Sequence, residues 1–433
     1  MNSKLLHPKS ISLDDLDPRI DWNRPLMAPG HMGVDFETRV DFKRLHKYRL
    51  SRAKQALANS DVSALILFDV NNIRYISATK IGEWERDKFC RFALLIENME
   101  PIVWDFGSAA YHHKLYCDWL EDKNCKAGML GMRGTVPPSA GLMKNHAEEI
   151  LDILKSAGVS KDRIGVDVAE AAMIFELQKV GLNLVDGQQI MLDARELKNI
   201  DEVTLLNQAA SMVDGVYHMI YEELKPGVRE NDIVAKANKM LYEMGSDDVE
   251  AINAISGERC SPHPHNFTDR YFRPGDQAFF DILQSFVGYR TCYYRTFNIG
   301  KANDAQNDAY KQCREWLDKA IDLIKPGVST DKVASVWPKA EEFGFPSEMD
   351  AFGLQFGHGL GLALHERPII SRLVSLKDPM EIKTGMVFAL ETYCPAKDGI
   401  SAARIEEELV VTDDGCKVIS LFPAQDLPIS NRY

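Results

Sequence analysis

The sequence predicts a two-domain α+β protein in which a small α/β domain precedes a larger domain with an internal repeat. Its 433 residues are enough for two or three domains of ordinary size. Helical and strand patterns alternate up to about residue 190. Beyond that point, two long stretches of the chain match each other in order and spacing. We place an N-terminal arm at 1–38, the α/β domain at 39–194 and the repeat-containing domain at 195–433.

The composition excludes several classes of function. A hydrophobic content of 45% and a charged content of 27% are those of a globular protein. The net charge of −13 argues against binding to nucleic acid or to an anionic membrane, because both need a basic surface. No apolar run is long enough for a spanning helix, and the first residues show no secretion signal.

The eight cysteines form no Cys-x-x-Cys pair and no dense framework. Reduced thiols are therefore a simpler interpretation than a disulfide scaffold or a zinc finger, and we expect a cytoplasmic protein. The arm at 1–38 is rich in Pro, Asp and Asn. We expect it to be extended, and ordered only where it packs on the protein body or on a second subunit; a floppy tail is the alternative.

The α/β domain is predicted from its alternating elements. Helices are expected at 42–60 and 147–157, buried strands at 63–69, 92–96, 101–105 and 163–167, and a turn with a strand at 71–75. The domain holds no glycine-rich phosphate loop and no nucleophile elbow, so we expect it to support the site. Asp69, Asp105 and the pair His112-His113 can reach an active site, but surface or turn polar groups are the favoured interpretation. A long amphipathic helix from Asp201 to about Glu223 opens the next domain.

The larger domain contains the internal repeat. Leu224–Val228 recurs as Ile324–Val328, 100 residues later. Pro274–Asp281 likewise aligns with Thr384–Glu391, so that each copy ends on a carboxylate six residues after a glycine. A duplicated half-domain with pseudo-two-fold symmetry explains both matches. We therefore expect the two strands to bring these carboxylates together across the centre of one sheet.

Four polar residues of this domain lie in or beside apolar, β-prone runs: Asp281, His358, Glu391 and Glu406. Burying such groups is costly unless they bind a cation, bind one another or do chemistry. Three carboxylates and one imidazole suit a divalent ion such as Mn, Fe, Co or Zn, and the sequence does not choose among them. Such an ion polarises a carbonyl group or lowers the pKa of a bound water. We therefore predict that these residues form one metal cluster.

Four more residues are candidates for roles around this cluster. His365 and His265 are candidates for moving protons during catalysis. His263 lies beside His265 in a proline-containing loop segment and is a candidate for substrate binding. Arg404 is two residues from Glu406, so on a strand it shares that residue's face and can grip a substrate carboxylate at two points. A structural ion pair is the alternative for Arg404.

In their order along the chain, these motifs resemble those of the pita-bread metallopeptidases of family M24, which include prolidase, aminopeptidase P, methionine aminopeptidase and creatinase. The motifs are Gly-Asp-x4-Asp at 275–281, Gly-Tyr at 288–289, Arg-Thr-Phe at 295–297, Gly-His-Gly-x-Gly-x3-His-Glu at 357–366, Gly-Met-Val-x3-Glu at 385–391 and Arg-Ile-Glu at 404–406. The resemblance covers about 195–420, and the front domain is similar to that of the creatinase, prolidase and aminopeptidase P branch. It implies a pita-bread C-terminal domain after a smaller creatinase-type α/β domain.

The resemblance also implies a set of site residues. The family carries two aspartates, one histidine and two glutamates around two metal ions. Asp281, His358, Glu391 and Glu406 match the first aspartate, the histidine and the two glutamates, whereas Cys292 stands where the second, bridging aspartate is expected. In this set Glu391 is both a metal ligand and a candidate catalytic residue. Tyr289, from the Gly-Tyr pair, is a further candidate for substrate binding.

Cys292 leaves three possibilities for the metal. A thiolate binds Zn, Fe or Co, but it is softer and longer than a carboxylate oxygen. Either Cys292 is an unusual ligand, or a single ion binds, or none does. Creatinase, in the same family, lacks the metal set and uses a histidine in a loop similar to the one that holds His265. A metal-free mechanism with His265 as base and Glu391 as its partner therefore stays open.

A second, partial likeness is to the dimethylsulfoniopropionate lyases of this fold. Ser256–Pro262 resembles their Ser-Gly-Pro-Arg-Thr-Asn-Pro, Phe68–Tyr75 resembles their Phe-Asp-Pro-Leu-Asn-Ile-Arg-Tyr, and Trp104-Asp105 also matches. Those lyases place a catalytic aspartate shortly after the His-Gly-x-Gly motif, near the point where this chain has His365, and they keep the full metal set. The likeness therefore concerns the substrate side of the site alone.

We predict from these observations a hydrolase that cleaves a C–N bond of the amide, amidine or Xaa-Pro type in a small polar substrate. Water or metal hydroxide is the expected nucleophile, with one or two divalent ions or a metal-free centre. One alternative is a lyase acting by β-elimination on dimethylsulfoniopropionate or a similar onium carboxylate; another is a catalytically silent binding protein. Family members with this front domain are commonly dimers, so we expect a homodimer.

Overall fold

The computed structural model describes residues 40–82, 91–129 and 134–432, so the predicted arm at 1–38 lies outside the described residues. The chain divides into two compact units, each described by itself below. The first holds Asp61–Gly187, and the second holds Phe42–Ser60 together with the chain from Gln188 onward. The division at Gly187 falls a few residues before the boundary predicted at 194. No described helix is long and apolar enough to cross a membrane.

The first unit is a six-stranded mixed sheet with helices packed on it, in the strand order β4-β3-β2-β1-β5-β6. Its strands are β1 Ala64–Leu67, β2 Phe92–Ile96, β3 Ile102–Asp105, β4 Cys125–Ala127, β5 Arg163–Val166 and β6 Asn183–Asp186; its α-helices are α2 Val70–Ser77, α4 Gly107–Tyr116, α5 Leu142–Ser156 and α6 Ala171–Lys179. The predicted strands at 63–69, 92–96, 101–105 and 163–167 and the helix at 147–157 are confirmed. All four residues of β1 and all five of β2 are buried, which explains their continuous apolar runs.

One prediction for this unit is wrong, because residues 71–75 lie in helix α2 and form no strand. The Asp69 side chain accepts hydrogen bonds from the backbone N–H groups of Asn71 and Asn72, at 2.7 and 3.1 Å. This N-cap satisfies two of the donors that a helix start leaves unpaired, and it outweighs the β preference of Ile73 and Tyr75. Asp69 therefore has a structural part in this turn.

Two of the other polar residues singled out in this unit, Asp105 and His113, form a local pair. Asp105 is fully buried at the end of β3, and its carboxylate lies 2.8 Å from Nε2 of His113 and 3.1 Å from Nε of Arg91. Burying a carboxylate requires such partners, so these contacts account for Asp105 and His113 without any catalytic part.

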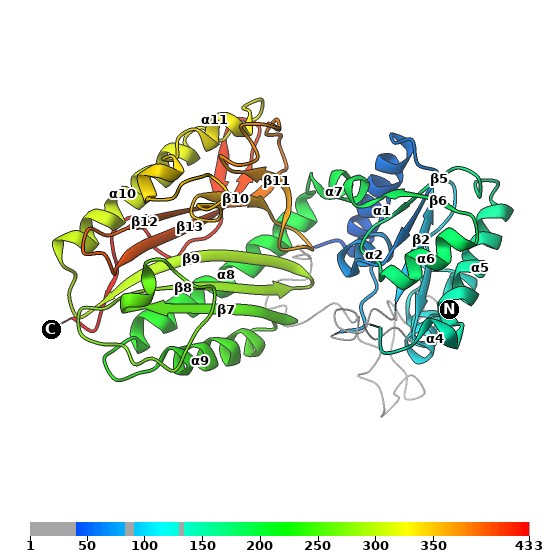
Figure 1. Cartoon of the computed structure of the whole chain (residues 1–433). Coiled ribbons are helices and arrows are strands. Elements are labelled where there is room, and N and C mark those ends of the chain that lie inside the picture. Colours follow the sequence, from blue (N-terminus) through cyan, green and yellow to red (C-terminus); the bar gives the residue numbers. More distant parts are fainter. Residues whose placement is uncertain (1–39, 83–90, 130–133, 433) are drawn as a thin grey trace, which may run out of the picture. The chain divides into compact units, whose positions relative to one another are not determined.

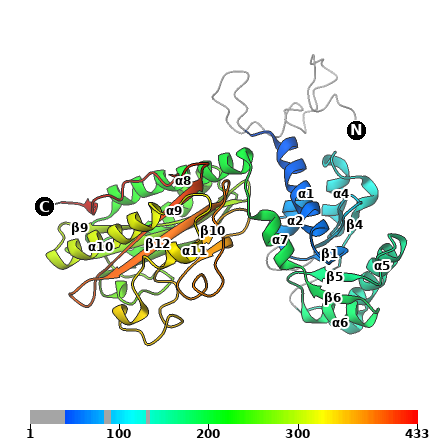
Figure 2. The same ribbon diagram turned by 90° about the horizontal axis from the view of Figure 1, so that it is seen from above.

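The second unit contains two sheets whose strands are mainly antiparallel, together with the helices that cover them (Figure 1). The four-stranded sheet runs β15-β9-β8-β7 and the five-stranded sheet β11-β10-β12-β13-β14. The strands are β7 Asp248–Ser256, β8 Gln277–Phe286, β9 Tyr289–Ile299, β10 Phe356–Gly359, β11 Glu366–Ile370, β12 Val387–Pro395, β13 Ala402–Val411, β14 Cys416–Val418 and β15 Ile429–Ser430; the α-helices are α1 Phe42–Ala58, α7 Gln188–Arg195, α8 Ile200–Glu223, α9 Glu230–Glu243, α10 Asp304–Ile321 and α11 Thr330–Ala334. In Figures 1 and 2, α8 and α9 run along β7–β9, and α10 runs along β12 and β13.

The repeat predicted from the sequence recurs in the backbone. Gly227 and Gly327 both have positive φ, 89° and 83°, and their N–H groups donate to Phe272 and Ile382 carbonyl oxygens at 3.0 and 2.9 Å. Both long helices also begin alike, since α8 and α10 each start with a capping box, on Asn199 and Asn303. The same turn and the same helix start therefore occur once in each half.

The placement of the two repeated carboxylates differs from the prediction. Asp281 lies on β8 and Glu391 on β12, which belong to different sheets, so they do not face each other across one sheet. The junction between the sheets is made by β9 and β13. Thr296 Oγ1 donates to the Arg404 carbonyl oxygen at 2.6 Å and accepts from the Arg404 N–H at 2.9 Å. A side chain thus takes the place of the ladder bonds that would have merged the two sheets.

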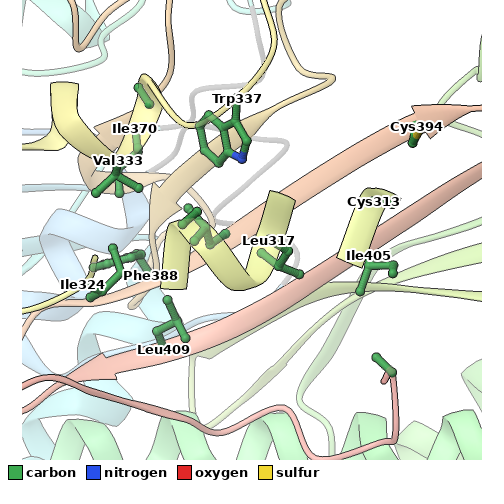
Figure 3. Close-up of a cluster of buried hydrophobic side chains, with 14 of the residues drawn as sticks. Cys313, Leu317, Ile324, Val333, Trp337, Ile370, Phe388, Cys394, Ile405 and Leu409 are labelled. Atoms are coloured by element: carbon green, nitrogen blue, oxygen red, sulfur yellow. The ribbon is translucent and has the colours of Figure 1, made fainter. Parts of the chain in front are cut away.

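Helix α10 is held on the five-stranded sheet by an apolar core (Figure 3). Leu317 of α10 is fully buried in the same cluster as Phe388 of β12 and Ile405 of β13. Trp337, after α11, belongs to this cluster too. A corresponding cluster joins α8 and α9 to the four-stranded sheet, so each half carries its own core.

We expect Leu317→Ala to lower the free energy of unfolding by about 2–5 kcal/mol, because it leaves a cavity in a closed core. The measurement is urea denaturation followed by circular dichroism. Leu421→Ala is the matched control: Leu421 is 67% exposed, and its loss should change the free energy by no more than about 0.5 kcal/mol. Equal losses in the two variants would show that this cluster is not the stabilising core.

Candidate metal centre

One face of the five-stranded sheet carries three of the predicted ligands. In the strand register, His358 lies opposite Ala389, and Glu391 lies opposite Glu406. Because directly paired residues point to the same side of a sheet and alternate residues share a face, His358, Glu391 and Glu406 project together. Arg404 is on this face as well, two residues before Glu406 on β13.

The four-stranded sheet supplies the other two predicted ligands. Asp281 of β8 lies opposite Tyr294, and Cys292 of β9 lies opposite Leu283, two residues further along β8, so Asp281 and Cys292 share a face. The Cys292 sulfur is 3.5 Å from Oδ1 of Asp281. The β9–β13 junction brings this face to the residues of the other sheet.

The centre of the site is a group of three side chains. One ligand atom each from Cys292, His358 and Glu406 lies within 4.8 Å of the other two. Nε2 of His358 is 3.9 Å from Oε1 of Glu406. The five predicted ligands are at most 6% exposed, so the whole group is withdrawn from water.

These residues fit a bound cation. Both carboxylate oxygens of Glu406 are buried and have no hydrogen-bond partner, a costly arrangement for an acceptor. Nδ1 of His358 lies 3.2 Å from the Gly359 carbonyl oxygen, which fixes the proton on Nδ1 and leaves Nε2 free as a ligand. A sulfur, an imidazole nitrogen and a carboxylate oxygen form a donor set for one borderline divalent ion. No second carboxylate stands at Cys292 to bridge two ions.

Arg404 is bound within the site. Its guanidinium donates to Glu391, to the Gly353 carbonyl oxygen at 2.8 Å and to Nε2 of His263 at 2.8 Å. The guanidinium carbon also lies 4.5 Å from the centre of the Tyr294 ring. Arg404 thus forms the structural ion pair, with Glu391 as its partner. A substrate carboxylate would have to compete with these partners for the guanidinium. Burial, followed by the charge of Arg404, lowers the pKa of His263, so this ring accepts as a neutral imidazole.

Burial governs the protonation of the cluster. It raises the pKa of Asp281 to about 6 and that of Glu391 to about 7. Burial, and then the charges of Glu391 and Asp281, raise the pKa of Glu406 well above its usual range. Burial also raises the pKa of the Cys292 thiol, with Asp281 and Glu406 adding to it, and lowers the pKa of His358 to about 3. Every shift disfavours charge, and a divalent cation reverses that preference for the anionic ligands.

The glycines beside His358 allow neighbouring strands to approach it closely. A Cβ at Gly357 would lie 2.9 Å from Cδ1 of Leu390, and one at Gly359 would collide with the Arg367 carbonyl oxygen. The pairing of β10 with β11 shifts register between His358 and Gly359. A side chain at either glycine would therefore displace the strand that positions His358.

The remaining candidates take different positions. His365 is partly exposed, and the centre of its ring lies 4.4 Å from that of His358, at the border of the cluster. The buried part of the His365 side chain accounts for its lowered pKa. His265 is exposed in its loop, 4.5 Å from the His263 ring, and burial and Arg404 lower its pKa. Tyr289 is not placed with the cluster: it is buried, and its hydroxyl donates to Glu202 at 2.9 Å. The substrate and proton roles of these residues stay predictions.

Two supporting residues were not identified from the sequence. Asn253 donates to Oδ2 of Asp281 at 3.0 Å. Glu408 accepts hydrogen bonds from the Cys292 N–H and from Oγ1 of Thr291, both at 2.6 Å, and so fixes the backbone of Cys292. Glu408 follows Glu406 by two residues, and that spacing was a usable signal because it puts both carboxylates on one face. Asn253, a single polar residue in an apolar strand, gave no comparable signal.

Comparisons with known proteins find relatives of both parts of the chain. Residues 204–413 match the model of metallopeptidase family M24, and residues 49–197 match that of the creatinase/prolidase N-terminal domain. An Xaa-Pro dipeptidase of Pyrococcus furiosus is 27% identical over 277 residues, which are 62% of this chain and 76% of the relative. A probable dipeptidase PepE of Mycobacterium bovis is 25% identical over 385 residues, 87% of this chain and 94% of the relative.

Solved structures share the fold. A dipeptidase from Pyrococcus horikoshii OT3 gives a TM-score of 0.70 at 21% identity and covers 88% of this chain and 99% of its own. Dipeptidase PepE from Mycobacterium ulcerans gives 0.70 at 22% identity and covers 90% and 100%. These likenesses confirm the predicted fold class, a creatinase-type front domain followed by a pita-bread domain.

A chain with this front domain, this duplicated second domain and a buried cluster of acidic and histidine ligands is of the pita-bread metallohydrolase class. The two family matches together span most of its length, and the chain belongs to metallopeptidase family M24. It is accordingly a hydrolase of the M24 type. The predicted likeness to dimethylsulfoniopropionate lyases is without support among the relatives named above.

We expect Arg404→Met to lower the free energy of unfolding by about 3–5 kcal/mol, because it leaves the Glu391 carboxylate buried without its cation. Arg372→Met is the control, since Arg372 pairs at 2.8 Å with the partly exposed Glu348 and should cost about 1 kcal/mol or less. Denaturation of both variants by urea makes the comparison. A loss in Arg404→Met no larger than that in Arg372→Met would contradict the structural role of the pair.

Proposed function

We propose that this chain hydrolyses the C–N bond of a small peptide, with dipeptides of the Xaa-Pro type as the substrate class. The carrying observation is the buried Cys292, His358 and Glu406 group in the M24 domain, with both Glu406 oxygens unpartnered. The named relatives are dipeptidases, and their identity extends over most of the chain in the case of PepE. Family M24 generally uses divalent metal ions, and the identity of the ion is part of this proposal.

Each site residue has a distinct part in the proposed reaction. Cys292, His358 and Glu406 would hold the ion, with Asp281 and Glu391 completing the anionic wall around it. The bound ion supplies a polarised carbonyl oxygen and an acidified water.

Residues beside the ligands handle the substrate and the proton. His365, at the border of the cluster, would give a proton to the leaving amine or hold the carbonyl oxygen. Glu391, whose burial raises its pKa to about 7, would accept a proton from the attacking water at neutral pH. Arg404 orients Glu391 through their ion pair.

We expect the wild-type chain to hydrolyse Xaa-Pro dipeptides, and His358→Ala to lower kcat/KM more than about 100-fold, beyond the loss of a merely supporting group. His365→Ala should lower kcat by about 10²–10⁴-fold. The assay is release of free proline after loading with a divalent metal. His218→Ala, an exposed residue of α8, is the control and should keep full activity. Full turnover in His358→Ala would remove the proposed site.

We also propose that the chain is a homodimer, as expected from the resemblance of its front domain. Gel filtration at micromolar concentration should then give an apparent mass twice the 48.8 kDa of the chain. Elution as a monomer at that concentration would remove the proposal. A cytoplasmic location stays a prediction from the sequence.

A further inference from the structure

We propose that this centre binds one divalent ion, of the borderline kind represented by Zn²⁺ and Co²⁺, through the Cys292 thiolate, the His358 imidazole and the Glu406 carboxylate. This inference rests on the proposed function and deepens it, because it replaces a carboxylate-bridged pair of ions with a single thiolate-bound one.

The three donors are prepared for such an ion. Their ligand atoms lie within 4.8 Å of one another, so small side-chain adjustments bring them to the bond lengths of one ion placed between them. The bond from His358 Nδ1 to the Gly359 carbonyl oxygen directs Nε2 to the ligand. The Cys292 backbone is held by Glu408 at 2.6 Å, so its sulfur is positioned before any ion arrives.

The unpartnered oxygens of Glu406 point to the ligand independently. Glu406 is 0% exposed, and neither oxygen has a hydrogen-bond partner in the described residues. The neighbouring carboxylates are already bonded: Asp281 accepts from Asn253 at 3.0 Å, and Glu391 accepts from Arg404. Of the three carboxylates, Glu406 is therefore the one without a hydrogen-bond partner, and it is also the one grouped with Cys292 and His358.

Two features of the site favour one ion over two. A bridging carboxylate offers an oxygen to each of two ions, whereas Cys292 offers a single sulfur. The protein itself supplies a positive charge beside the single ion, because the Arg404 guanidinium is bonded to Glu391 on the same face. A further divalent ion would have to compete with that fixed cation at short range.

The thiolate also selects the metal. Sulfur ligands favour Zn²⁺ and Co²⁺ over Mn²⁺ and Mg²⁺, which prefer oxygen. With three protein ligands, the fourth position of a tetrahedral ion stays open for water or substrate, as hydrolysis requires. On binding, the sulfur–metal bond replaces the S–H bond, and the released proton passes to Asp281, 3.5 Å away, or to solvent.

The test is titration of the metal-free full-length protein with Co²⁺, followed by near-ultraviolet absorption and by metal content after gel filtration. We expect one equivalent per chain and a sulfur-to-cobalt charge-transfer band. Cys292→Ser should abolish the band and weaken Co²⁺ binding about tenfold or more. Cys292→Asp should lack the band but still take up Co²⁺, because a carboxylate oxygen replaces the sulfur as ligand. Cys416→Ser, a free thiol on β14 away from the ligands, should behave as the wild type.

Several outcomes overturn the inference: two equivalents in the wild type, a band that survives Cys292→Ser, no uptake of Co²⁺, or Mn²⁺ bound as tightly as Co²⁺. Circular dichroism of Cys292→Ser excludes unfolding as the cause of a lost band, and Cys292→Asp gives a second reading if Cys292→Ser is unstable. Failure of the proposed function looks different. One thiolate-bound ion without dipeptide hydrolysis would refute the peptidase activity alone, and two ions with full hydrolysis would refute this inference alone.

Discussion

The contact between β9 and β13 is the constraint on which the rest of the site depends. Each sheet has its own helices and its own apolar core, and neither holds a complete ligand set. Thr296 ties the two strands by bonding to both backbone groups of Arg404, and Glu408 reaches from β13 to the Cys292 N–H. These few bonds set the distance between the sulfur on one sheet and the imidazole and carboxylate on the other. The ligand geometry therefore depends on a junction made by side chains.

Burial is the second constraint on the site, because buried acidic groups gain stability when they bind a cation. The carboxylates and the thiol are withdrawn from water, and their pKa values rise as a result. Without a cation, keeping several of these buried groups ionised together is unfavourable. Arg404 offsets one of them, and the oxygens of Glu406 are left for a metal. The electrostatics of the buried side chains and their donor chemistry thus lead to the same class of ligand.

The sequence predicted the fold in its main lines because the repeat and the apolar periodicity are local signals. The duplicated turns at Gly227 and Gly327, and the strands that carry Asp281 and Glu391, could be read directly from spacing. Two predictions failed where the deciding bond involves a side chain: the Asp69 cap made a helix of residues 71–75, and Thr296 kept the sheets separate. The hydrogen bond from the Cys292 N–H to Glu408 also involves a side chain. It could not be predicted because it joins residues 116 positions apart.

The two halves of the duplicated domain have diverged without losing their common frame. One half contributes an aspartate and a thiol, and the other contributes an imidazole, two glutamates and a guanidinium. The turns and helix starts that define the frame carry none of the ligands. In the proposed metal centre, a change at Cys292 would therefore alter the choice of ion while the architecture is inherited intact. Duplication has in this way separated the part of the chain that specifies the shape from the few side chains that specify the chemistry.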